Sequence, residues 1–155
     1  MASIQESIDV EVPVNTAYNQ WTQFEEFPKF MEGVKSVSQL DDTHLRWVAE
    51  AGGQEHQWTA EITEQHPDER VAWKAIEGHG NSGVVTFHRL GSTETRVTVQ
   101  MEHETEGIME TLGSAVGADS RRVQGDLERF KDLIESRGSE SGAWRGEVEQ
   151  GRQVR

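Results

Sequence analysis

The chain of 155 residues contains no cysteine and only three prolines. The absence of cysteine excludes disulfide bonds, thiolate nucleophiles, thiolate zinc sites and iron–sulfur clusters, so any chemistry must come from carboxylate, imidazole and hydroxyl groups. No window approaches the run of about 18 apolar residues that a membrane-spanning helix needs, and no basic region followed by an apolar segment opens the chain. We therefore expect a cytoplasmic protein without stable membrane insertion.

Positive charge is also scarce. The formal net charge is −13, and no basic cluster is larger than Arg121-Arg122. Such a chain repels phosphate backbones and anionic lipids at long range, so we expect no nucleic-acid partner. The length fits a single domain that buries about two-thirds of its unfolded surface and folds without cross-links. Both a monomer and a homodimer are compatible with the sequence.

Aromatic residues gather near the N-terminus, at every third position from Tyr18 to Phe30. A helix turns about 100° per residue, so a step of three leaves each ring about 60° short of the previous one, and five rings cannot share one core-facing stripe. Pro28 removes a backbone donor and pushes Phe27 out of the helical region. We predict two short helices, at roughly 15–23 and 24–32, whose rings either fill the core or border a cavity.

Alternating apolar residues predict a first strand and then a long antiparallel meander. Residues 3–12 place apolar side chains on even positions, and Glu6 interrupts that face. From Val34 to about residue 104, five turn signals divide six further strands, and the connections are too short for parallel crossovers. One face of the meander is polar. The other face carries large apolar side chains, namely Trp47, Trp58, Trp73, Phe87 and Met101.

From Gly107 the apolar period becomes helical and continues to Ile134. The glycines between Gly113 and Gly117 predict a kink or a break, and Arg137-Gly138 predicts the end of the helix. We expect residues 1–138 to form a single domain and residues 139–155 to form a polar, flexible tail, part of which Trp144 can anchor on the body.

Six histidines raise the question of metal or acid–base chemistry. Their spacing matches no helical ligand pair, so we expect neither a metal nor a cofactor. His56 and His103 align with the inward positions of the strands, and Glu6 is the clear inward carboxylate. These three are candidates for proton transfer, or else hydrogen-bonded structural groups. The other histidines are interpreted as solvated: His44, His66, His79 and His88.

Five segments together resemble a known superfamily: Ile8–Val14, Trp21–Met31, Ala60–Glu64, Gly83–Phe87 and Arg122–Lys131. In the order strand, two short helices, meander and long helix, they resemble the START-like helix-grip superfamily (SRPBCC). The closest similarity is to its bacterial polyketide cyclase/dehydrase or coenzyme-Q-binding branch. The resemblance implies an α+β fold in which a curved antiparallel sheet of about seven strands wraps around the long C-terminal helix, with a hydrophobic cavity between them.

The resemblance implies no shared catalytic motif, so three hypotheses stay open. The first is binding of one small hydrophobic molecule that is lipid-, quinone- or polyketide-like. The alternative is a polyketide-type cyclase, dehydratase or aromatase that uses Glu6, His56 or His103 for proton transfer. In the third, the cavity is filled by the protein's own side chains, and its role is stress-related or based on interactions. The residues expected to contact a ligand are Trp47, His56, Trp58, Trp73, Phe87, Met101, Phe27 and Phe30.

Overall fold

The computed structural model of the chain describes residues 2–51, 53–77, 81–103 and 115–154. It begins with strand β1 (Ala2–Val10), helix α1 (Val14–Trp21) and the 3₁₀ helix η1 (Phe24–Lys29). Six strands follow: β2 (Val34–Asp41), β3 (His44–Ala51), β4 (Gln54–His66), β5 (Arg70–Glu77), β6 (Asn81–Gly91) and β7 (Glu94–His103). The last elements are helix α3 (Ala115–Arg137) and two short strands, β8 (Val148–Glu149) and β9 (Arg152–Gln153).

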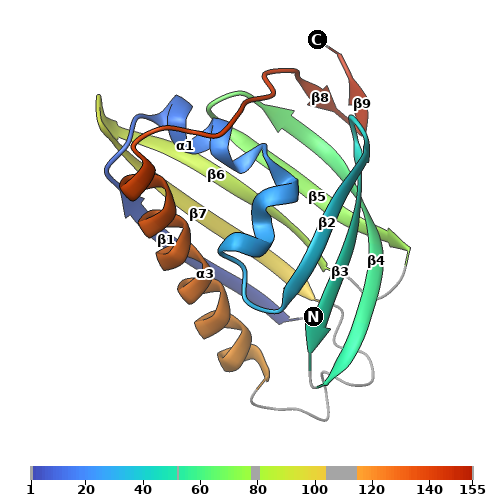
Figure 1. Cartoon of the computed structure of the whole chain (residues 1–155). Helices are drawn as coiled ribbons and strands as arrows, with labels where there is room; N and C mark the ends of the chain where they lie inside the picture. The colour runs from blue at the N-terminus through green and yellow to red at the C-terminus, as the bar shows by residue number, and fades with distance from the viewer. Residues whose placement is uncertain (1, 52, 78–80, 104–114, 155) are drawn as a thin grey trace.

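The strands form one antiparallel sheet in the order β1-β7-β6-β5-β4-β3-β2. The first strand returns to pair with the last strand of the meander, from Ala2 opposite His103 to Val10 opposite Thr95. Figure 1 shows the sheet bending around the side on which α3 lies. The predicted helix-grip architecture is confirmed, and β8 and β9 are a small addition to the seven strands expected.

The five aromatic residues spaced from Tyr18 to Phe30 lie in the core, where α1, η1 and α3 meet. Each of these residues is at most 5% exposed. Phe130 of α3 lies 5.0 Å from Trp21 and 5.2 Å from Phe30, measured between ring centroids. These rings meet edge-on, which is a preferred geometry for aromatic pairs. Helix α1 gives way to η1 at Thr22 and Gln23, close to the predicted boundary between two short helices. Pro28 lies inside η1 and does not separate the two helices.

Helix α3 buries the described part of the expected stripe, from Val123 to Ile134, and polar contacts fix it against the segment after η1. The part of the stripe before residue 115 lies outside the described residues. Asp126 accepts a hydrogen bond from the Glu32 backbone at 2.9 Å, and Arg129 donates to the Phe30 carbonyl at 2.9 Å. The helix ends at Arg137, as predicted, and Gly138 adopts a positive φ of 73°. The predicted break between 113 and 117 lies partly outside the described residues. No described helix is long and apolar enough to cross a membrane.

The segment after residue 138 lies against the body (red in Figure 1). Strand β4 has 13 residues and β3 only 8, so the end of β4 extends past β3 and pairs with β8, placing Gln65 opposite Val148. Val148 is 0% exposed, and Trp144 packs on the core. This arrangement differs from the flexible tail expected, because a two-residue strand leaves no detectable pattern in a polar sequence. The domain boundary at residue 138 stays a prediction.

Candidate functional site

The concave face of the sheet has a closed part and a more open part. Under α1, η1 and α3, side chains such as Ile62, Val85 and Val97 are 0% exposed. Other inward side chains of the sheet are only half-buried. These are Trp47, His56, Trp58, Trp73 and Met101. Half-buried apolar side chains on a concave face are what a small-molecule site requires.

Trp47 and Trp58 form the centre of this open part. They are cross-strand partners of β3 and β4, and their indole rings stack with centroids 5.7 Å apart and an interplanar angle of 8°. Phe27 lies 5.6 Å from Trp47 and joins the stack to the core. The Nε1 atom of Trp47 is buried, and no described residue accepts a hydrogen bond from it. An unpaired buried donor costs about 1–3 kcal/mol. This nitrogen is covered in the structure, so a ligand oxygen can pair with it only after the indole ring moves to expose it.

Trp73 lies in a cross-strand row with Gly83, Met101 and Ile4. A Cβ added at Gly83 would meet Cζ2 of Trp73 at 3.0 Å and would come still nearer to the backbone oxygen of Gln100. The Trp73 ring can therefore occupy its position only because Gly83 has no side chain.

A hollow of about 340 Å³ lies at this end of β1, β6 and β7. Ile4, Gly83 and Met101 contribute to it, but much of its lining belongs to the polar outer face, including Gln5 and Gln100. It is therefore a hollow at the strand ends rather than an internal cavity between the sheet and α3.

Glu6 faces inward, as the alternation on β1 predicts. It is the register partner of Val99 and accepts a hydrogen bond from the hydroxyl of Ser120 on α3. This short contact joins the first strand to the helix across the concave face. Arg46 and Lys74 contact acidic residues of the outer face, Glu77 and Glu61 respectively.

The other two proton-transfer candidates lie apart from Glu6. His56 is half-buried on β4, opposite Ala49, and β7, β6 and β5 separate it from β1. Four strand spacings correspond to about 19 Å along a sheet, so Glu6 and His56 do not form an acid–base pair. His103 is the last residue of β7, and its side chain lies outside the described part of the chain.

His66 is buried, which corrects the expectation that it is solvated. It is 7% exposed, and its Nδ1 atom donates to Glu147 at 2.7 Å. The C-terminal segment covers this histidine, and that cover could not be predicted from the turn sequence around it. Within the described part of the chain, one group has donor atoms that all lie within 4.8 Å and could hold a metal ion: His66, Glu147 and Glu149.

Sequence reasoning missed three buried polar side chains, Tyr18, Gln20 and Gln65, each 0% exposed. The Tyr18 hydroxyl, Nε2 of Gln20 and both amide atoms of Gln65 have no hydrogen-bond partner among the described residues. Burial raises the pKa of Tyr18 to about 12, although Gln65 and the nearby Arg145 guanidinium act against that shift. Tyr18 therefore stays protonated at neutral pH and can donate.

A register shift on β4 explains why Gln65 was missed. Strict alternation after Trp58, Ala60 and Ile62 would turn Glu64 and His66 inward. The pairing of β4 with β5 is irregular between Ile62 and Glu64, so the alternation changes phase there. Gln65 then faces the core. No residue in this stretch signals the shift, which depends on how the two strands pair.

The fold and its half-open aromatic face define a helix-grip protein of the START type. Residues 10–132 match the family described as polyketide cyclase/dehydrase and lipid transport. The match spans most of the chain, which therefore belongs to this family.

The chain is similar to three further proteins. An uncharacterized 17.2 kDa protein of the melC2–rnhH intergenic region in Streptomyces lincolnensis is 52% identical over 149 residues, covering 96% of this chain and 99% of that protein. A START superfamily protein from Mycobacterium smegmatis has a TM-score of 0.73 at 14% identity, covering 88% of this chain and 99% of its own. The Zhui aromatase/cyclase from Streptomyces sp. R1128 has a TM-score of 0.74 at 16% identity, covering 92% and 98%. The two solved structures show a shared fold.

Proposed function

We propose that the chain binds one small hydrophobic molecule, of lipid-, quinone- or polyketide-like character, between the open part of the concave face and α3. The observation that carries this proposal is the stacked pair of Trp47 and Trp58, with the buried and unpartnered Nε1 of Trp47 beside it. The family description, which names both polyketide cyclases and lipid transport, supports the same class of ligand.

The half-buried apolar side chains of the concave face suit a hydrophobic ligand. Trp58, Trp73 and Met101 are half-buried and present apolar surface, and each Å² that a ligand covers contributes about 25 cal/mol. The Trp47 N–H adds a directional contact, which favours a molecule with a carbonyl oxygen, such as a quinone or a polyketide.

Three of the residues expected to contact a ligand are buried. Phe27, Phe30 and Phe87 are 3%, 2% and 6% exposed, respectively, and they pack in the core. Phe27 supports Trp47 by direct ring contact, whereas Phe30 and Phe87 pack against Trp21 of the core.

Tryptophan fluorescence tests the binding proposal. Titration with a panel of quinones, fatty acids and aromatic polyketides should give saturable quenching for at least one class. Trp47→Phe keeps an aromatic ring but removes the N–H, so it should weaken binding of a carbonyl ligand by about tenfold, the equivalent of one hydrogen bond. Trp144→Phe, in the C-terminal segment, is the matched control and should bind normally. A flat response across the whole panel would overturn the proposal.

A second candidate function is a cyclase or dehydratase acting in the same place. The observation that favours it is the carboxylate of Glu6 beside the hydroxyl of Ser120, because a positioned acid–base group accelerates proton transfer by about 10²- to 10⁴-fold. Glu6→Gln and Ser120→Ala should each lower turnover of a poly-β-ketone substrate. His56→Gln tests the remaining described candidate. Unchanged turnover in all three variants would remove this function and leave ligand binding intact.

A further inference from the structure

The C-terminal segment brings acidic side chains against acidic side chains on the outer face of β4. Glu149 on β8 is the direct register partner of Glu64 on β4. Like charges directly opposite one another in an antiparallel pair are destabilising. Arg70 contacts Glu64 at 2.8 Å and also lies near Glu149, and Nε2 of His66 lies 3.3 Å from Glu64. The pairing of β8 with β4 therefore joins two strands with a surplus of negative charge.

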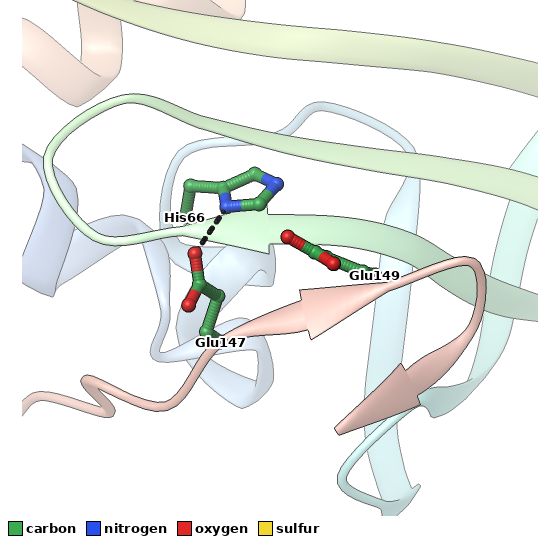
Figure 2. A group of neighbouring side chains, drawn as sticks. All are labelled: His66, Glu147 and Glu149. Atoms are coloured by element: carbon green, nitrogen blue, oxygen red, sulfur yellow. Dashed lines mark hydrogen bonds and ion pairs between the residues drawn. The ribbon is translucent and has the colours of Figure 1, made fainter. Parts of the chain in front are cut away.

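Strand alternation places the side chains that could bind a metal on the outer side of the sheet. Val148 points into the core, so Glu147 and Glu149 both point outward. The register shift on β4 turns His66 to the same side. Figure 2 shows the three side chains converging from the two strands, with His66 bonded to Glu147 and the carboxylate of Glu149 lying near the ring.

We infer that His66, Glu147 and Glu149 form a site for a divalent cation of the zinc type, which clips the C-terminal hairpin to β4. An imidazole and two carboxylates are a donor set that zinc accepts, and three protein ligands leave a position for water. The cation would replace the proton now shared between His66 Nδ1 and Glu147, which are 2.7 Å apart.

The geometry requires two small adjustments: His66 Nδ1 and the Glu147 carboxylate, now 2.7 Å apart, must separate by less than about 1 Å, and Glu149 must approach them. The three donor atoms lie within 4.8 Å of one another, whereas the ligands of a tetrahedral zinc ion are about 3.4 Å apart at bond lengths near 2.1 Å. Glu149 is exposed, so its carboxylate can move by about 1 Å through a change of rotamer. A hollow of about 420 Å³, lined by His66, Glu149, Arg70 and their neighbours, gives an ion access from solvent.

The inference is separate from ligand binding on the concave face, because Val148 and Gln65 lie between the two sides of the sheet. A cation site and a simple ion pair also predict different responses to zinc. A His–Glu pair needs no metal, whereas a cation site makes attachment of the hairpin depend on zinc.

Metal titration of the full-length chain tests the site. After dialysis against a chelator, isothermal titration with zinc chloride should show one ion per chain, and zinc should raise the unfolding temperature. His66→Gln and Glu149→Gln should each weaken zinc affinity by at least about tenfold. Glu149 is exposed, so its variant tests the site even if the His66 variant folds poorly.

His44→Gln is the matched control. His44 also contacts two acidic residues, Asp41 at 2.8 Å and Glu61 at 3.8 Å, but through different ring nitrogens, so they do not converge on one point. This variant should bind zinc like the parent. Zinc should also slow tryptic cleavage after Arg145 and Arg152, because it holds the hairpin in place. Absence of zinc binding, or binding that survives both His66→Gln and Glu149→Gln, would overturn the inference.

Discussion

The indole rings of Trp47 and Trp58 lie parallel across β3 and β4, 5.7 Å apart between centroids. This contact should make the ring of Trp47 matter more to stability than its nitrogen does. Trp47→Phe removes an unpaired buried donor and should change the free energy of unfolding by less than about 1 kcal/mol. Trp47→Ala also removes the half-buried ring and should cost about 2 kcal/mol, below the range for fully buried aromatics. Urea unfolding separates the two, and equal losses would contradict this account.

Gly83 should tolerate no side chain. Gly83→Ala would force a methyl group against the Trp73 ring and the Gln100 backbone, which should cost about 1–3 kcal/mol. The control is Gly91→Ala on the same strand, where no atom lies within 4 Å of an added Cβ. Chemical denaturation of both variants checks the prediction, which fails if the two are equally stable.

Phe130 should be among the most sensitive positions of the core. It is 0% exposed and contacts both Trp21 and Phe30. Phe130→Ala should lower the free energy of unfolding by about 3–5 kcal/mol. Glu128→Ala, an exposed position on the same helix, should change it by less than about 0.5 kcal/mol. A loss at Phe130 no larger than that at Glu128 would show that α3 does not pack as described.

Glu26 should make the protein sensitive to acid. Burial opposes its charge, but hydrogen bonds from Ser141 and Lys29 outweigh that effect and lower its pKa from 4.5 to about 2. A carboxyl group with a lowered folded-state pKa contributes stability above the unfolded-state value, and this contribution is lost as the pH falls from about 4.5 towards 2.

Glu26→Gln should therefore flatten the fall in stability across this acid range, and urea midpoints measured at a series of pH values check it. Glu128→Gln serves as the exposed control and should keep the parent's profile. A Glu26 variant with the same acid slope as the parent would be incompatible with the contacts to Ser141 and Lys29.

Val148 should hold the C-terminal segment on the body. It is 0% exposed, whereas Val154 is 50% exposed. Val148→Asp removes about 1.5 kcal/mol or more of apolar burial and places a charge in the core, so tryptic cleavage after Arg145 and Arg152 should be at least about tenfold faster. Val154→Asp should leave the cleavage rate unchanged. Equal rates in the two variants would mean that β8 does not dock on β4.

Local sequence patterns determined most of the architecture. Alternation on β1 and the meander, the division into two short helices near residue 23, and the end of α3 at Arg137 all depend on neighbours a few residues apart, where backbone sterics and side-chain periodicity act directly. The same reasoning placed Trp47, Trp58, Trp73 and Glu6 on the concave side.

Only the tertiary structure decided the remaining features. The partner of Glu6 is Ser120, more than a hundred positions away, and the phase change that turns Gln65 inward depends on the register between β4 and β5. The burial of His66 depends on the C-terminal strand that covers it. These features arise from pairings between distant segments, whose free energies are shared among many weak contacts and leave no signal in any short stretch of the chain.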